Sequence, residues 1–115
     1  MSIGEIGRQL GEYDERARAA QAAAAQALGR LLQIAERTDS GQAGRIAQFI
    51  AATYNGHSYG FDLFDLRAVD VEISDDMLSC LDALRWGKSD LYNLIPDGDR
   101  RIQAMCKAWG IVARG

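Results

Sequence analysis

Carboxylates are the side chains in this sequence with the clearest capacity for chemistry, and they crowd its middle. Residues 61–82 hold seven Asp and Glu residues and one base, Arg67. Asp75 and Asp76 are adjacent and of the type that could share general acid–base work. Neighbouring residues of a helix point about 100° apart, however, so this pair would not share one site. The pattern therefore favours a solvated acidic surface over a catalytic pair.

The other reactive side chains are isolated in the sequence. His57 is the single histidine and has no cysteine beside it, whereas a metal site needs three or four protein ligands. Cys80 and Cys106 show no CxxC spacing and no neighbouring base, which favours buried, reduced thiols. No glycine-rich phosphate loop follows a strand pattern. We expect no catalytic residue, no metal site and no cofactor, and we predict that the protein is not an enzyme.

The carboxylates are better candidates for binding a partner. Residues 51–82 carry one base and seven acids, a balance of −6, whereas residues 1–50 balance to zero and residues 83–115 to +3. An acidic surface repels phosphate backbones, so direct DNA binding is not expected. It attracts basic protein surfaces. The candidate partner-binding residues are Asp62, Asp65, Asp70, Glu72, Asp75 and Asp76.

Helices are expected to position these groups, because apolar residues recur at spacings of three and four in each long segment. The predicted fold class is all-α, a small helical bundle of about four main helices. No run shows the alternation of a strand between hairpin turns. The expected helices are residues 3–38, roughly 41–55, one ending near residue 86, and about 99–109.

Shorter signals predict how these helices begin and end. Residues 62–68 are expected to form a short helical turn capped by Asp62, and either Asp70 or Ser74 caps the helix that follows. Asn55 and Gly56 predict a left-handed end to the second helix. Large aromatic residues at helical spacing usually lie in a core. The predicted core aromatics are Phe49, Phe61, Phe64, Trp86 and Trp109.

The first helix carries a heptad stripe that runs from Ile3 to Ile34 and is made only of alanine in its middle. At ~1.5 Å per residue it would be about 50 Å long, longer than such a domain is wide. We expect residues 1–26 to form an Ala-rich helical arm, frayed near its first glycines, and residues 27–115 to form a helical domain. The stripe either packs on its own bundle or pairs with a second copy. The self-association candidates are Tyr13, Ala17, Ala20 and Ala24.

Neither a membrane span nor an export signal is expected. No segment has the eighteen or so consecutive apolar residues of a membrane helix. The N-terminus lacks a basic region followed by an apolar run. We predict a cytoplasmic protein without membrane contact.

Three parts of the sequence carry a resemblance to a known family. They are ALGRLLQIAERTDSGQAGRIAQFIAATYNG, then FDLFDLRAVDVEISDDML, then the region of Trp109. Over residues 27–112 the chain resembles an uncharacterised family of small proteins encoded on proteobacterial plasmids, prophages and other mobile elements. The alanine-rich arm is extra to that pattern.

The resemblance implies a context in which small proteins often act by binding host machinery. Anti-CRISPR proteins are such a group, and many occupy the basic surfaces by which a CRISPR complex holds DNA. The resemblance thus suggests a basic host protein or protein–RNA complex, such as a CRISPR effector, as the partner. The alternative is a self-associating structural or regulatory protein that forms a homodimer through its first helix. Salt would separate the two, because charge-driven binding weakens with ionic strength and apolar association does not.

Overall fold

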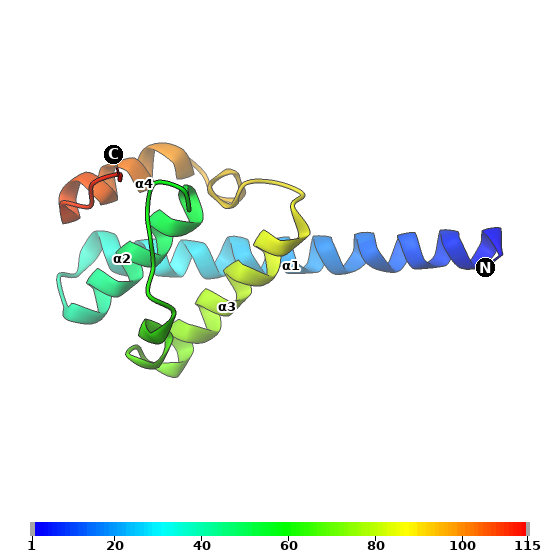
Figure 1. The fold of residues 1–115 in the computed structure, drawn as a ribbon, viewed down its shortest axis with the longest axis horizontal. Coiled ribbons are helices and arrows are strands. Elements are labelled where there is room, and N and C mark those ends of the chain that lie inside the picture. The colour runs from blue at the N-terminus through cyan, green and yellow to red at the C-terminus, as the bar shows by residue number, and fades with distance from the viewer. Residues whose placement is uncertain (1, 115) are drawn as a thin grey trace.

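The computed structural model describes residues 2–114, and these form helices joined by short loops (Figure 1). Within this range there is no strand, which confirms the predicted all-α class with four main helices. In chain order the elements are α1 (Ile3–Arg37), α2 (Gly41–Tyr54), the short 3₁₀ helix η1 (Leu63–Arg67), α3 (Val71–Trp86), the 3₁₀ helix η2 (Leu91–Leu94) and α4 (Gly98–Trp109).

Helix α1 is continuous from Ile3 to Arg37, and the glycines near its start are helical, while the fraying expected there stays a prediction. Ser2 and Glu5 form a reciprocal cap, in which the Ser2 hydroxyl accepts from the Glu5 N–H and the Glu5 carboxylate accepts from the Ser2 N–H. Such a cap satisfies backbone donors that the first turn leaves free. Alanine, which has the highest helix propensity, dominates the middle of the helix. The cap and the alanines both offset the loss of helix stability that the glycines cause.

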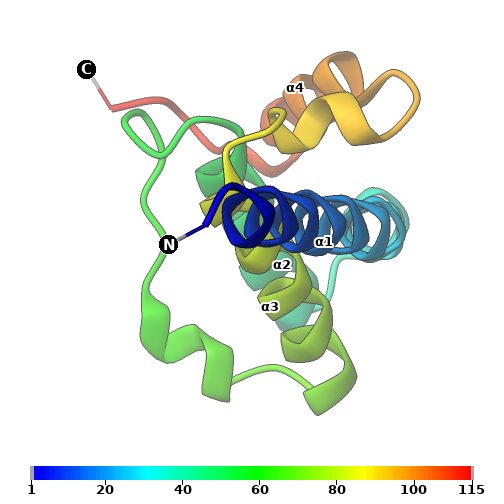
Figure 2. The ribbon, with the colours of Figure 1, turned by 90° about the vertical axis from the view of Figure 1, so that its right-hand side faces the viewer.

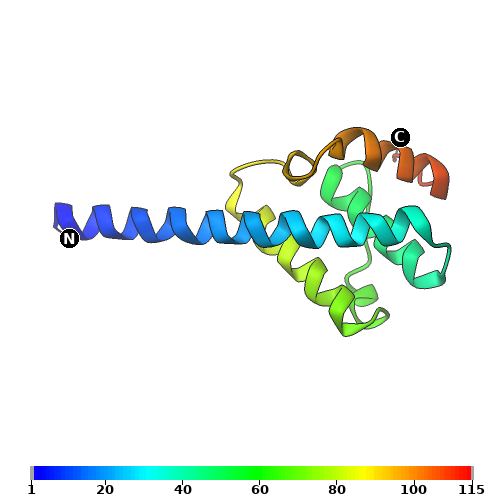
Figure 3. The same cartoon turned by 180° about the vertical axis from the view of Figure 1, so that it is seen from behind.

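The core forms where α2, α3 and α4 gather around the second half of α1. Helix α1 packs mainly against α3 and then against α2, while α4 packs against α2 and η2 (Figures 2 and 3). Small residues on α1, among them Ala20, Ala24 and Ala27, are buried and let α3 approach closely. The largest fully buried side chains are Leu28, Leu31, Leu32, Ile46, Ile50, Met77, Cys80, Leu91 and Ile102.

The first half of α1 projects from this body as an arm (Figure 1). Residues 2–16 are all exposed, and burial begins at Ala17, before the predicted domain boundary at residue 27. The molecule is accordingly 54 Å long but only 29 by 25 Å across.

Aromatic and charged contacts fix the base of the arm against the end of α3. The rings of Tyr13 and Trp86 meet edge to face with centroids 4.5 Å apart. The Arg16 guanidinium lies 5.2 Å from the Trp86 ring, and Lys88 Nζ lies 3.4 Å from Asp14 Oδ1. The arm therefore leaves the body in a defined direction.

Glycine ends two of the helices, as its conformational freedom allows, whereas the end of α2 differs from the prediction. Gly87 and Gly110 end α3 and α4 in the left-handed region, at φ of +65° and +69°. Asn55, in contrast, is extended at φ −154°, so the predicted left-handed end of α2 is wrong. Its side chain explains the difference, because Asn55 Oδ1 accepts from the backbone N–H groups of His57 and Ser58 and turns the chain without a positive φ.

The predicted aromatic core is confirmed for some residues and wrong for Phe64. Phe49 is buried and meets Phe61 edge to face, and Trp109 Nε1 donates to the Ala35 carbonyl at 2.8 Å. Phe64 is 70% exposed. It lies on η1, a short 3₁₀ helix on the outside of the body, where Leu66 is the residue that packs against the core. The helical spacing that marks a core stripe does not hold over so short an element.

We predict that substitution by alanine lowers the free energy of unfolding strongly at Phe49 and hardly at all at Phe64. Phe49→Ala removes a buried ring and should lower the free energy of unfolding by about 3–5 kcal/mol. Phe64→Ala removes an exposed ring and should change it by no more than about 0.5 kcal/mol. Urea unfolding followed by circular dichroism measures both. A large loss for Phe64→Ala would contradict the exposed position.

Candidate protein-interaction surfaces

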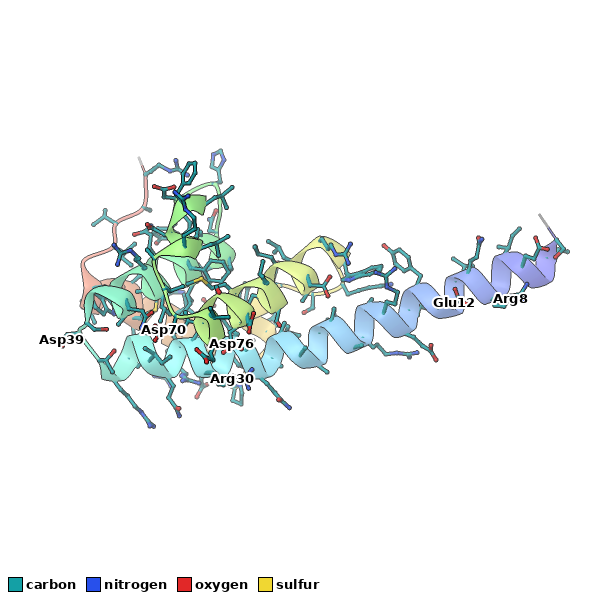
Figure 4. All side chains as sticks on the ribbon, turned by 90° about the horizontal axis from the view of Figure 1, so that it is seen from below. Arg8, Glu12, Arg30, Asp39, Asp70 and Asp76 are labelled. Atoms are coloured by element: carbon teal, nitrogen blue, oxygen red, sulfur yellow. The ribbon has the colours of Figure 1, made fainter. Side chains whose placement is uncertain are left out.

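One of the candidate acids, Asp76, joins α3 to α1. Asp76 and Arg30 form a two-pronged ion pair, with Arg30 Nη2 2.8 Å from Oδ1 and Nε 3.0 Å from Oδ2 (Figure 4). The hydrogen bond and the charge of Asp76 raise the pKa of Arg30. The Asp76 side chain is only 17% exposed. Asp76 therefore braces the two helices and offers little surface to a partner.

Other candidate acids hold the segment between α2 and α3. Asp62 accepts from the Phe64 N–H at 2.9 Å and caps η1 as predicted. Asp65 Oδ1 lies 3.5 Å from Arg45 Nε on α2. Asp70 pairs with Gln42, donating its backbone N–H to Oε1 at 2.5 Å and accepting from Nε2 at 3.3 Å.

The side-chain caps predicted for α3 are therefore wrong. The Asp70 carboxylate makes no cap, because Gln42 on α2 binds it instead. Asp70 still precedes the helix, and its backbone carbonyl accepts from the Ile73 and Ser74 N–H groups. The Ser74 hydroxyl donates to the Val71 carbonyl, inside the helix.

Glu72 and Asp75 lie outside these pairs and are exposed on α3. Val71 and Leu78 are exposed beside them, and spacings of three, four and seven put these residues on one side of the helix. Leu63 and Phe64 on η1 are exposed as well. The apolar–acidic surface is defined by Leu63, Phe64, Val71, Glu72, Asp75 and Leu78.

An apolar hollow of about 240 Å³ adjoins this surface. Its walls come from α2, from the chain between α2 and η1, and from α3, with Leu63, Leu81 and Leu84 among the lining residues. Leu63 belongs to both features, so the apolar side chains continue from the surface into the hollow.

Sequence reasoning found the acids of this surface but missed its apolar members. The sequence predicts Phe64 in the core and includes Leu78 in the same helix-spaced apolar set, and it does not single out Val71 or Leu63. The signal that could have found Leu78 is its helical position, which lies about 160° from Cys80, the middle one of the three buried residues of α3, Met77, Cys80 and Ala83.

A second apolar surface lies on the arm. Ile3, Ile6, Leu10 and Tyr13 are exposed large side chains at spacings of three and four, and Ile3 is 89% exposed. Of the residues predicted for self-association, only Tyr13 belongs to this stripe, because Ala17, Ala20 and Ala24 are buried within their own chain. We call Ile3, Ile6, Leu10 and Tyr13 the arm stripe.

A hollow of about 610 Å³ lies between the end of α2 and α4, and two of its lining residues, Tyr54 and Gln103, are hydrogen-bonded to Asp99. The Tyr54 hydroxyl donates to the Asp99 carboxylate, and Gln103 Nε2 donates to both, at 3.0 Å and 2.8 Å. This contact to Asp99 raises the pKa of Tyr54, and the hydroxyl lowers the pKa of Asp99. The network joins α2 to α4.

The two thiols lie in the core and are not bonded to each other, as predicted. Burial raises the pKa of Cys80 to about 12 and raises that of Cys106, which keeps both protonated near neutral pH. Over residues 2–114, no three histidine, cysteine or acidic side chains gather closely enough to hold a metal ion.

The fold and these surfaces define an all-helical protein whose exposed features are an apolar–acidic surface and an apolar arm. The chain belongs to a family of unknown function (DUF7673), which matches residues 25–110. This range nearly coincides with the resemblance over residues 27–112, while the arm precedes it. No curated protein and no solved structure matches the chain. The family description assigns no activity, and the mobile-element origin stays a prediction.

Among the helices of residues 2–114, none combines the length and apolar character needed to cross a membrane.

The Tyr54–Asp99 contact predicts a pH dependence of stability. Because the folded state lowers the pKa of Asp99, the carboxylate contributes stability above its unfolded pKa of about 3.9, and this contribution is lost as pH falls through the lower folded value. Wild type should therefore exceed Asp99→Asn in unfolding free energy at pH 6, and the difference should vanish in the acid range. A difference that grows as pH falls below about 4 would contradict the assignment.

Proposed function

We propose that the protein is a non-enzymatic binding protein whose apolar–acidic surface contacts a basic, partly apolar surface of another protein. The observation that carries the proposal is the exposure of Leu63 and Phe64 on η1 and of Val71 and Leu78 on α3, where the acids Glu72 and Asp75 are also exposed. Large apolar side chains that form a continuous exposed patch typically mark interaction sites.

The two kinds of residue would contribute differently. Burial of Leu63, Phe64, Val71 or Leu78 by a partner would stabilise a complex by up to about 1.5–3 kcal/mol each. Aromatic anchors of this kind often dominate an interface. Glu72 and Asp75 would accelerate encounter with a basic partner and disfavour acidic ones.

The candidate acids that are bound within the chain hold the segment that carries this surface in position. Asp62 caps η1, Asp65 joins it to α2 through Arg45, and Asp70 is held by Gln42. These contacts hold η1 and the start of α3 in place before any partner binds. A surface fixed in advance loses less conformational entropy on binding.

The resemblance to mobile-element proteins supports a finer proposal. The partner would be a host defence nucleoprotein complex, and the protein would cover its basic, nucleic-acid-binding surface in the manner of an anti-CRISPR protein. The acidic charge of residues 51–82 fits such a surface and disfavours direct binding to DNA.

Two variants test the surface. Phe64→Ala removes the main apolar anchor, and the double variant Glu72→Lys, Asp75→Lys reverses the unpaired charge. Both should fold with little change in stability, because the altered side chains are exposed. We expect capture of a basic host protein from lysate by the wild type, loss of that protein with either variant, and loss of capture at high salt.

The matched control is Glu12→Lys, Glu15→Lys, which changes the net charge by the same amount on the exposed arm (Figure 4 labels Glu12). It should capture the same basic protein as the wild type. Asp76→Lys is a poor probe, since it would break the pair with Arg30 and destabilise the fold. Identical capture by the wild type and both surface variants would overturn the proposal.

A further inference from the structure

The arm stripe continues a stripe that is already an interface inside the chain. Ile3, Ile6, Leu10 and Tyr13 have the same heptad spacing as Ala17, Ala20 and Ala24, which α3 covers. The face that α3 covers on the second half of α1 is therefore bare from Ile3 to Leu10 and half-covered at Tyr13, whose ring meets Trp86.

We infer that the bare half is covered by the arm of a second copy, and that the two arms run antiparallel in a two-fold symmetric dimer. Symmetric pairing of one surface with itself is the commonest way in which soluble chains form oligomers. Four side chains of this size offer on the order of 500 Å² per arm, and two arms about 1,000 Å², which reaches the lower limit for a specific interface.

The position of α3 selects the antiparallel arrangement. In a parallel pair the partner's α1 would continue along the same face past Ala17, where α3 already lies. In an antiparallel pair the partner's arm would end near Tyr13 and Trp86, and the two bodies would lie at opposite ends of the paired arms.

The antiparallel register follows from centring the two stripes on each other. Ile6 then faces Leu10 of the second copy, and Ile3 faces Tyr13. The residues that flank the centre are Gly7 and Gln9, both uncharged, so no like charges are forced together there. The dimer would carry two apolar–acidic surfaces, and only this last consequence rests on the proposed function.

The oligomeric state of the full chain tests the inference. Light scattering after size exclusion should give twice the monomer mass for the wild type. The double variant Ile6→Glu, Leu10→Glu places two charges in the stripe and should halve that mass.

The matched control is Arg8→Glu, which changes the net charge by the same −2. Arg8 lies on the side of the helix opposite the stripe, since residues two positions from Ile6 and Leu10 point about 160° away (Figure 4). This control should remain dimeric. A monomeric wild type at every accessible concentration, or a double variant that stays dimeric, would overturn the proposal.

A distance measurement tests the orientation independently of these variants. Gln26 is exposed on α1, whereas both native thiols are buried, so a spin label on Gln26→Cys would attach at one place. In the antiparallel register the two labels lie about 50 Å or more apart along the helix axis, from ~1.5 Å per residue. Parallel helices with axes roughly 8–10 Å apart would bring the labels within about 30 Å, and that result would overturn the antiparallel dimer.

Discussion

The close packing of α1 against α3 is the interaction on which the other features of this structure depend. The small side chains of Ala20, Ala24 and Ala27 let the two helices approach closely. The ion pair between Arg30 on α1 and Asp76 on α3 holds the helices together. Alanine contributes little apolar surface of its own. The leucines that follow on α1, together with Ile46 and Ile50 from α2, therefore supply most of the buried volume.

This arrangement explains why the molecule has two bare apolar surfaces. Helix α3 ends at Gly87, so it covers α1 only as far as Tyr13 and leaves the arm stripe in solvent. The chain that leads into α3 passes over the outside of the body, and η1 presents Leu63 and Phe64 there. Both surfaces that we propose for binding therefore consist of apolar side chains that no other part of the chain covers.

Helix positions could be predicted from the sequence because three- and four-residue spacing persists over long segments, as in α1 and α4. The left-handed ends at Gly87 and Gly110 followed from glycine itself. Phe64 could not be placed, since its burial depends on whether a short 3₁₀ helix faces the core. The role of Asp70 depended on Gln42, which lies 28 residues away in sequence and comes close only in the fold. The acidic residues could be listed from the sequence, but which of them hold helices together and which are free needed the positions of Arg30 and Arg45.

Hydrogen exchange at two protein concentrations tests most directly the central claim, that the bare half of the α1 stripe is an interface. Residues 2–16 are all exposed, so in a monomer the amides of the arm should exchange quickly, while the body from Ala17 onward stays protected. If the arms pair, protection of residues 3–16 from exchange should rise with protein concentration, whereas protection of the body should not. Fast exchange in the arm at every concentration would contradict it.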